Sequence, residues 1–349
     1  MVTNTIPLPA TMRALEVRAY DGARASLVLV ERPLPQPAAA EVLIRVVASP
    51  INPSDLLFLE DRHGVHKPLP AIPGYFGSGV VVAAGTSMLA RMLVGQRVTF
   101  GADHPLSGAW AEYALVQALS CAPLLPSIGT AHAALLLLNP ITAWGLVDEA
   151  RQGRHRAIVQ TAAASEVGRW VVRLSRAAGL PLICVVRRAE HVDQLRAEGA
   201  DYVLNSSSPD FDQTLHSLSH RLGATIAFDA VGGHLMERLL LAMPSASRLL
   251  LYGLLEEGAY SIPPERMIFE RLRVEGFYML EWMQRRGYLQ TLRGFMAIQK
   301  LATEVHPSVR ACFPLEEAWS ALQLYRREMG AGKVLLMPGL RRGGCAPNV

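Results

Sequence analysis

The segment from Ala157 to Arg188 constrains the fold of this chain more than any other. An apolar run, a turn of small residues, an amphipathic stretch and a second apolar run follow one another within it. This order predicts strand, helix and strand, with the helix N-terminus beside the end of the first strand. Unpaired N–H groups and the helix dipole favour a phosphate at that point. The segment therefore predicts a dinucleotide-binding βαβ unit.

The turn of this unit departs from the glycine-rich fingerprint. It carries Ala162, Ser165 and Gly168, small residues that still let a pyrophosphate approach the backbone. Ser165 can cap the helix, whereas Glu166 would repel phosphates unless Arg169 offsets its charge. An ordinary strand-to-helix turn is the alternative interpretation. The residues expected to contact the cofactor here are Ala164, Ser165, Glu166 and Val167.

Two arginines, Arg187 and Arg188, stand where the second strand of the unit ends. An acidic residue at this place would hydrogen-bond the ribose diol of NAD. Guanidinium groups instead suit the additional 2′-phosphate of NADP, because they offer paired donors to it. The arginine pair therefore predicts NADPH as the cofactor.

Length and composition set the class. The 349 residues exceed the usual size of one domain, so two domains are expected, and half of the residues are hydrophobic. The net charge is +4 without a basic block, so no nucleic-acid partner is expected. The N-terminus shows no secretion signal and the apolar stretches are too short to span a bilayer, so no membrane association is expected.

The cysteines indicate a reduced setting. They are far apart and none belongs to a C-x-x-C pair, which argues against a zinc cluster or a disulfide framework. A cytoplasmic location is therefore expected. The four are Cys121, Cys184, Cys312 and Cys345.

Up to about Pro126 the chain is β-rich, with short alternating runs between Pro, Gly and acidic turns, which predicts a partly closed barrel. The stretch from Thr130 to Asp148 is predicted helical, with Asn139-Pro140 breaking it. The expected strands are Ala14–Val17, Ser26–Val30, Val42–Ala48, Gly79–Ala84, Gln96–Phe100 and Ala111–Val116.

From Ala157 onward strands and helices alternate, which predicts an α/β fold with a doubly wound parallel sheet. The expected strands are Ala157–Gln160, Leu182–Val186, Tyr202–Leu204, Ala224–Asp229, Arg248–Tyr252 and Arg273–Tyr278. The expected helices are Gly168–Ala178, Glu190–Glu198, Phe211–Leu218 and His234–Met243. The last segments, from about Glu281 to Pro338, are expected to return to the first domain.

Eight segments in this order resemble the medium-chain dehydrogenase/reductase superfamily, specifically its zinc-independent quinone and enoyl reductase branch. The resemblance covers nearly the whole length. The segments are Ile51–Asp55, Leu69–Gly85, Asn139–Trp144, Thr161–Gly168, Ala227–Gly233, Leu250–Gly253, Arg273–Met283 and Gly332–Pro338.

The resemblance implies a GroES-like catalytic domain from residues 1–126 and 282–349, and a Rossmann domain from residues 127–281 that binds NADPH. It places the cofactor in the cleft between the domains. It also implies a homodimer, formed through an edge strand that here would be Arg273–Tyr278.

Zinc-dependent relatives carry a Gly-His-Glu motif, where this chain has Gly74-Tyr75-Phe76. Tyr75 and Phe76 cannot complete a zinc site of the usual nitrogen, sulfur and carboxylate ligands. Since a metal would be needed to ionise an alcohol, hydride donation to a polarised acceptor is expected instead. A C=C bond conjugated to a carbonyl, or a quinone, meets that requirement.

Hydride addition to an enone needs a donor for the carbonyl oxygen and a proton for the α-carbon. In enoyl reductases of this branch a tyrosine follows the N-P-S-D motif, and His63 stands at that place here. We therefore predict His63 and Asn52 as catalytic residues. A solvent-exposed loop histidine and a turn-forming asparagine before Pro53 are the alternatives.

Further cofactor contacts are implied by the resemblance, each with a structural alternative. Thr142 can instead cap a helix, and Lys333 can simply be solvated. Phe277 and Tyr278 can equally be β-core or dimer-contact aromatics, and Gly253 after Tyr252 leaves room for the cofactor to pass closely. The expected contacts are Thr142, Tyr252, Gly253, Phe277, Tyr278 and Lys333.

The sequence thus predicts an NADPH-dependent reductase of an enoyl thioester or an α,β-unsaturated carbonyl. NADPH:quinone oxidoreduction is the alternative within enzymes. The non-enzymatic alternative is a protein of the same family that binds the cofactor but catalyses no reaction.

Overall fold

Contacts divide the chain into two units in the computed structural model, which describes residues 7–64, 66–102, 104–256, 262, 264–303, 309–328 and 332–340. The first unit combines residues 1–138 and 295–349, and the second comprises residues 139–294. These boundaries give residues 127–138 to the first unit and residues 282–294 to the second, unlike the boundaries expected from the sequence. No helix of the described ranges is long and apolar enough to cross a membrane.

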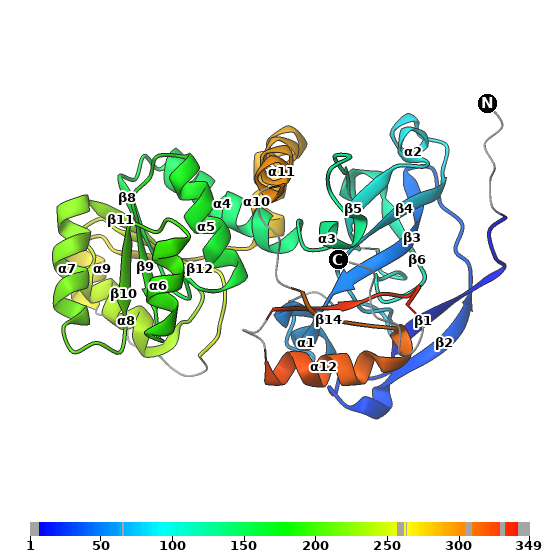
Figure 1. Cartoon of the computed structure of the whole chain (residues 1–349), viewed down its shortest axis with the longest axis horizontal. Helices are drawn as coiled ribbons and strands as arrows, with labels where there is room; N and C mark the ends of the chain where they lie inside the picture. Colours follow the sequence, from blue (N-terminus) through cyan, green and yellow to red (C-terminus); the bar gives the residue numbers. More distant parts are fainter. Residues whose placement is uncertain are drawn as a thin grey trace. The chain divides into compact units, whose positions relative to one another are not determined.

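A six-stranded parallel sheet organises the second unit (Figure 1). The strand order is β10-β9-β8-β11-β12-β13. Successive strands are added on one side of β8 up to β10, and on the other side of β8 from β11 to β13, so the predicted doubly wound sheet is confirmed. The strands are β8 (Ala157–Gln160), β9 (Leu182–Val186), β10 (Tyr202–Asn205), β11 (Ala224–Asp229), β12 (Arg248–Leu251) and β13 (Arg273–Gly276).

Helices cover both faces of this sheet, with α5 and α6 on one side and α7 and α8 on the other (Figure 1). The helices are α4 (Leu138–Gln152), α5 (Glu166–Ala177), α6 (Glu190–Ala197), α7 (Phe211–Leu222), α8 (Gly233–Ala242), α9 (Pro264–Phe269), α10 (Met279–Arg286) and α11 (Tyr288–Ala302). Apolar side chains from β8, β9 and β11 pack against α7 and α8 in one buried core. Two buried faces explain why these strands are mostly apolar.

The predicted helix break at Asn139-Pro140 is wrong. α4 begins at Leu138 and contains Pro140 in its first turn. The first N–H groups of a helix have no partner within the helix, so a proline there costs no hydrogen bond. The interruption lies earlier, since α3 ends at Ala133.

Antiparallel strands dominate the first unit, so its predicted β-rich character is confirmed. They form a seven-stranded sheet in the order β14-β15-β3-β4-β5-β7, with β6 also paired to β3, and a separate β1-β2 pair. The strands are β1 (Thr11–Val17), β2 (Leu27–Pro33), β3 (Glu41–Pro50), β4 (Phe76–Ala84), β5 (Arg97–Gly101), β6 (Tyr113–Gln117), β7 (Cys121–Pro123), β14 (Val309–Phe313) and β15 (Lys333–Leu336). The C-terminal strand β15 pairs with β3, which brings Leu335 beside Pro50.

Four helices accompany these strands: α1 (Pro53–Leu59), α2 (Met88–Leu93), α3 (Thr130–Ala133) and α12 (Ala318–Arg327). α1 is not among the helices expected from the sequence. The helix starts there because Pro53 presets the first turn and Asp55 accepts a hydrogen bond from the N–H of Asn52, at 2.8 Å. Leu56 and Phe58 then anchor α1 in a core shared with α12 and β15. This packing positions Asn52.

Candidate active site

Asn52 lies at the centre of a buried polar cluster in the first unit. Its side chain is 1% exposed, and its Oδ1 accepts a hydrogen bond from the ammonium of Lys333 at 3.2 Å. Its Nδ2 has no hydrogen-bond partner in the part of the chain that the structure describes. A buried donor without a protein partner is costly, so the amide is suited to a ligand oxygen. The two predicted site residues Asn52 and Lys333 are therefore brought together.

Asp55, in the first turn of α1, accepts a hydrogen bond from the main-chain N–H of this asparagine. It is buried, and burial raises its pKa to about 7. The N–H groups of Asn52 and Tyr75 and the charges of Lys333 and Lys67 act in the opposite direction. The carboxyl is thus poised to change charge near neutral pH.

His63 lies against Tyr75. The tyrosine hydroxyl and the imidazole Nδ1 are 3.3 Å apart, and the rings stack with centroids 4.8 Å apart at 27°. Phe58 of α1 packs edge-on against the same tyrosine ring at 5.4 Å. His63 lies in the loop after α1 and is half-buried against this ring.

Lys67 carries a buried ammonium beside this pair. Its side chain is 5% exposed, and Nζ donates to the carbonyls of Ala102 at 3.1 Å and Ser107 at 2.5 Å. Nζ also lies 5.3 Å from the centre of the Tyr75 ring. Sequence reasoning named neither Lys67 nor Tyr75 as a functional residue, although Tyr75 at the place of a zinc-ligating histidine was a usable signal.

The predicted phosphate turn in the second unit has the geometry of a helix N-terminus. Ser165 caps α5 by accepting a hydrogen bond from the N–H of Gly168 at 3.1 Å. A Cβ at Gly168 would lie 2.5 Å from the carbonyl oxygen of Ala163, so only glycine fits where the helix meets the turn. Ala162 has a φ of +46°, in the region that glycine usually occupies. Ala164 lies in this turn, and Val167 in the first turn of α5.

Glu166 is turned toward the helix. Its carboxylate accepts a hydrogen bond from Trp170 Nε1 at 3.1 Å, one helical turn further on. Arg169 pairs with Glu198, so the suggestion that Arg169 offsets Glu166 is wrong. The orientation of Glu166 reduces the repulsion that its charge would exert on a phosphate.

The ends of β11 and β12 form a second polar cluster. Asp229 accepts hydrogen bonds from the N–H groups of Val231 and Gly232, each at 3.0 Å, and so holds the turn after β11. Burial raises the pKa of Tyr252, Asp229 raises it further, and the Ser165 hydroxyl lowers it in part. The Tyr252 hydroxyl makes no well-formed hydrogen bond to any described residue. This hydroxyl and Ser165 therefore meet at the edge of the sheet where cofactors bind.

Gly253 follows this tyrosine and is closely packed. A Cβ there would lie 3.1 to 3.2 Å from atoms of Ala230. Ala230, which follows β11, therefore leaves little space for a side chain at Gly253.

Arg187 and Arg188 are exposed at the end of β9. Arg188 pairs with Glu190 at 3.4 Å, both side chains being about two-thirds exposed, 64% and 66%. The hydroxyl of Ser207 donates to the carbonyl of Arg187 at 3.2 Å, which holds the backbone of Arg187. This hydrogen bond keeps Ser207 next to the main chain of Arg187.

The remaining predicted contacts lie on other elements of the second unit. Thr142 is 8% exposed on α4. Phe277 packs toward Gly145 of α4 and lines a cavity of about 130 Å³ with Trp282, while Tyr278 is 48% exposed at the start of α10. Phe277 is half-buried at this position.

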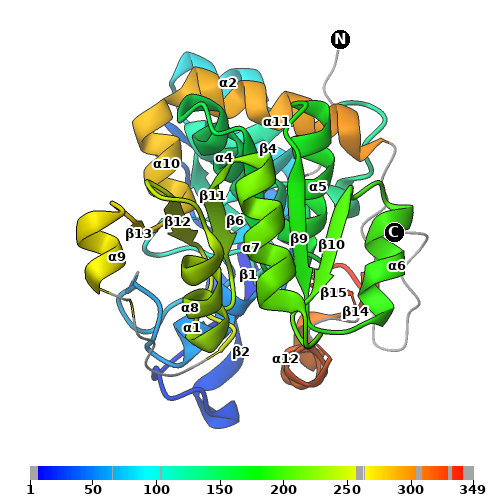
Figure 2. The same cartoon turned by 90° about the vertical axis from the view of Figure 1, so that its left-hand side faces the viewer.

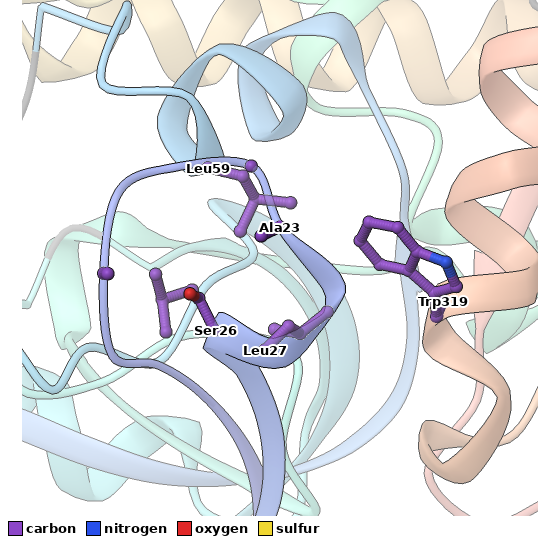
Figure 3. A pocket seen from close by; sticks show the side chains of 8 residues that line it. Ala23, Ser26, Leu27, Leu59 and Trp319 are labelled. Carbon is purple, nitrogen blue, oxygen red and sulfur yellow. The ribbon is translucent and has the colours of Figure 1, made fainter.

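A depression in the first unit is shown in Figure 3, lined by Ala23, Ser26, Leu27, Leu59 and Trp319 among others. It encloses no volume that a water molecule would fill, and none of the side chains lining it is titratable. It is therefore not a catalytic site. Within the described ranges, no group of three His, Cys, Asp or Glu side chains is placed to hold a metal ion.

Two family models match the chain: the alcohol dehydrogenase GroES-like domain over residues 38–127, and zinc-binding dehydrogenase over residues 167–294. The chain is similar to a crystal structure of a "putative NADPH:quinone reductase" from Mesorhizobium loti, with 32% identity, a TM-score of 0.84, and coverage of 95% of this chain and 100% of that one. It is 28% identical to the mitochondrial enoyl-[acyl-carrier-protein] reductase of Arabidopsis thaliana, over 73% of this chain and 68% of the relative. The Homo sapiens enzyme of the same name is 27% identical over 94% of this chain and 89% of its own length.

The parallel sheet, the capped helix N-terminus and these matches define an oxidoreductase that binds a nicotinamide cofactor. The chain belongs to the medium-chain dehydrogenase/reductase superfamily, in its zinc-independent enoyl and quinone reductase branch.

Proposed function

We propose that this protein is an NADPH-dependent reductase that transfers a hydride to an activated C=C bond of an enoyl thioester or an α,β-unsaturated carbonyl, without a metal. The observation that carries the proposal is the contact of His63 with Tyr75 at 3.3 Å, together with the buried Asn52 amide. Asp55 links the two, because it accepts hydrogen bonds from the N–H groups of both Asn52 and Tyr75. A proton source and a free donor are the two groups that reduction of an enone requires. The enoyl reductase names of its relatives support the same chemistry.

Each group has a distinct task in this proposal. Bound NADPH supplies the hydride. Asn52 Nδ2 donates to a carbonyl oxygen of the ligand, and Lys333 polarises the amide by its bond to Oδ1. His63 provides the proton for the α-carbon.

The proposed cofactor site uses the described geometry of the second unit. The N-terminus of α5, capped by Ser165 and closely approached at Gly168, suits a pyrophosphate. The exposed guanidinium of Arg187 suits a 2′-phosphate, which favours NADPH over NADH. The other proposed contacts in this unit are Thr142, Ala164, Glu166, Val167, Arg188, Tyr252, Gly253, Phe277 and Tyr278. Lys333, on β15 of the first unit, is also proposed as a cofactor contact.

The test is oxidation of NADPH in the presence of crotonyl-CoA, a simple enone and a quinone, each followed by product analysis. We expect saturated product from the thioester or the enone. Reduction of the quinone alone would contradict the proposal. Binding of NADPH without turnover of any acceptor would also contradict it.

Quinone reduction is the second candidate function, because the structural relative at 32% identity is named for it. A reduced quinone takes its protons on oxygen, where solvent supplies them rapidly, whereas an enolate needs a placed acid at carbon. His63→Gln should therefore lower enone reduction far more than quinone reduction. His66 is exposed, so His66→Gln is the matched control and should leave both reductions unchanged.

We also propose a homodimer formed through β13, the edge strand of the parallel sheet (Figure 2). α9 beside it exposes Met267, Ile268 and Phe269, the last being 80% exposed. An open strand edge next to exposed apolar side chains favours association. Sedimentation should give a dimer for the protein and a monomer for Phe269→Glu; a monomeric parent protein would contradict the proposal.

A cytoplasmic location is proposed from the widely separated cysteines, of which Cys121 and Cys184 are buried. Relatives are named mitochondrial. Fractionation of the source cells should place the protein in the cytosolic fraction, and recovery in an organelle would contradict this.

A further inference from the structure

We propose that Tyr75 relays a proton to the substrate through His63, with the buried Lys67 ammonium stabilising the tyrosinate that is left. The inference rests on the proposed function and deepens it, because it states how an imidazole can serve at the place of a tyrosine acid. Tyr75 is a positioning residue in this scheme, and His63 is the residue that touches the substrate.

The geometry links the three side chains in one direction. The Tyr75 hydroxyl lies 3.3 Å from His63 Nδ1, and ring stacking holds the imidazole in place. Lys67 Nζ lies 5.3 Å from the centre of the tyrosine ring and is fixed by two main-chain carbonyls. A cation over a phenol makes its hydroxyl a stronger donor and a weaker acceptor. Tyr75 therefore donates to Nδ1, which leaves the imidazole proton on Nε2.

A neutral imidazole is a weak acid unless its second nitrogen gains a proton as the first one loses its own. In the relay, the O–H bond of Tyr75 breaks as an N–H bond forms at His63 Nδ1. The Nε2–H bond breaks at the same time as a C–H bond forms at the substrate α-carbon. The enolate charge ends on the phenolate oxygen of Tyr75. The starting state returns when solvent gives a proton to His63 Nε2 and the Nδ1 proton moves back to the phenolate oxygen.

The relay gives the buried ammonium of Lys67 a role. A lysine that is 5% exposed costs free energy, even with hydrogen bonds to the Ala102 and Ser107 carbonyls. Its charge near the Tyr75 ring compensates the negative charge that the relay creates. Asp55, which accepts a hydrogen bond from the Tyr75 N–H, is a further titratable group here, and Lys333 and Lys67 both act on its charge. His66, three residues after His63, pairs with Asp61 on the surface.

Tyr75→Phe tests the relay, because it keeps the ring contacts with His63, Phe58 and Lys67 and removes only the hydroxyl. Without the relay, only the imidazolium form of His63 can donate. The rate of enone reduction relative to the parent protein should then fall progressively as the pH rises, because only the protonated imidazole donates. Tyr113→Phe, the same change on β6, should keep the parent pH profile.

A parallel pH profile for Tyr75→Phe and the parent protein would overturn the relay. A second measurement needs no turnover: nitrogen NMR of histidine-labelled protein, with His63→Gln for assignment, reports which ring nitrogen carries the proton. The relay requires the proton on Nε2, and a proton on Nδ1 overturns it. If no acceptor is reduced, the proposed function fails by itself, and the NMR result still decides the Tyr75–His63 assignment.

Discussion

The ammonium of Lys333 donates to Oδ1 of Asn52 at 3.2 Å, across a sequence separation of 281 residues. The bond joins the C-terminal strand β15 to the residue that precedes α1. It is possible because β15 pairs with β3, whose last residue, Pro50, stands two positions before Asn52. Both ends of the chain therefore contribute to the polar cluster of the first unit.

Lys333→Met should lower the catalytic efficiency of enone reduction by about 10-fold to 100-fold, because a hydrogen bond to a charged group contributes about 1.5 to 3 kcal/mol. The amide of Asn52 would lose its orientation and its polarisation. Steady-state kinetics measures the effect, with the exposed Lys300→Met on α11 as the control. Equal efficiencies for Lys333→Met and the control would contradict this assignment.

Asp55 should give the stability of the protein a specific pH dependence. Its pKa is about 7 when folded, against an ordinary value of 3.8, so the folded chain binds more protons between these values. The free energy of unfolding therefore falls as pH rises through this window, by at most about 4 kcal/mol, and the effect is complete above the folded pKa.

Urea unfolding of Asp55→Asn at several pH values checks this dependence. The variant should lack the decline between the two pKa values. Asp201→Asn, at an exposed aspartate, should retain it. A decline of equal size in Asp55→Asn would show that other groups cause it.

Arg187→Ala should weaken NADPH binding by about 10-fold to 100-fold and leave NADH binding unchanged, because a doubly charged phosphate loses a paired donor. Arg188→Ala should have a smaller effect, since Glu190 already holds that guanidinium. Calorimetric titration with both nucleotides measures the preference. Arg196→Ala, on the exposed side of α6, is the control, and an unchanged NADPH preference in Arg187→Ala would exclude the proposed phosphate site.

Ala162→Gly should raise the free energy of unfolding by up to about 1 kcal/mol. Ala162 adopts a φ of +46°, where a Cβ is strained and glycine is not. Ala164→Gly in the same turn should instead lower stability, because the backbone of Ala164 does not have a positive φ and glycine only adds unfolded-state freedom. Urea unfolding compares the two, and a loss of stability in both variants would refute the strain at Ala162.

The parallel sheet could be predicted closely from the sequence. The observed bounds of β8, β9 and β11 coincide with the expected ones, because strands buried on both faces are short apolar runs ended by turn residues. The pairing of each helix with a face of the sheet follows from the right-handed crossover rule.

The first unit could be predicted less fully. The seven residues of α1 are too few for a helical period to stand out, and their helix depends on the Asn52–Asp55 cap and on packing against α12. Lys67 is buried by carbonyls of Ala102 and Ser107, contacts that no local pattern announces. For the same reason Tyr75 was recognised only as a missing zinc ligand, and its contact with His63 came from the structure.

Reduction of crotonyl-CoA with NADPH deuterated at the transferable C4 position tests the central claim most directly. The account predicts butyryl-CoA with one deuterium at the β-carbon and a solvent-derived proton at the α-carbon. Product without deuterium at the β-carbon, or an unreduced thioester in the presence of bound cofactor, would contradict it.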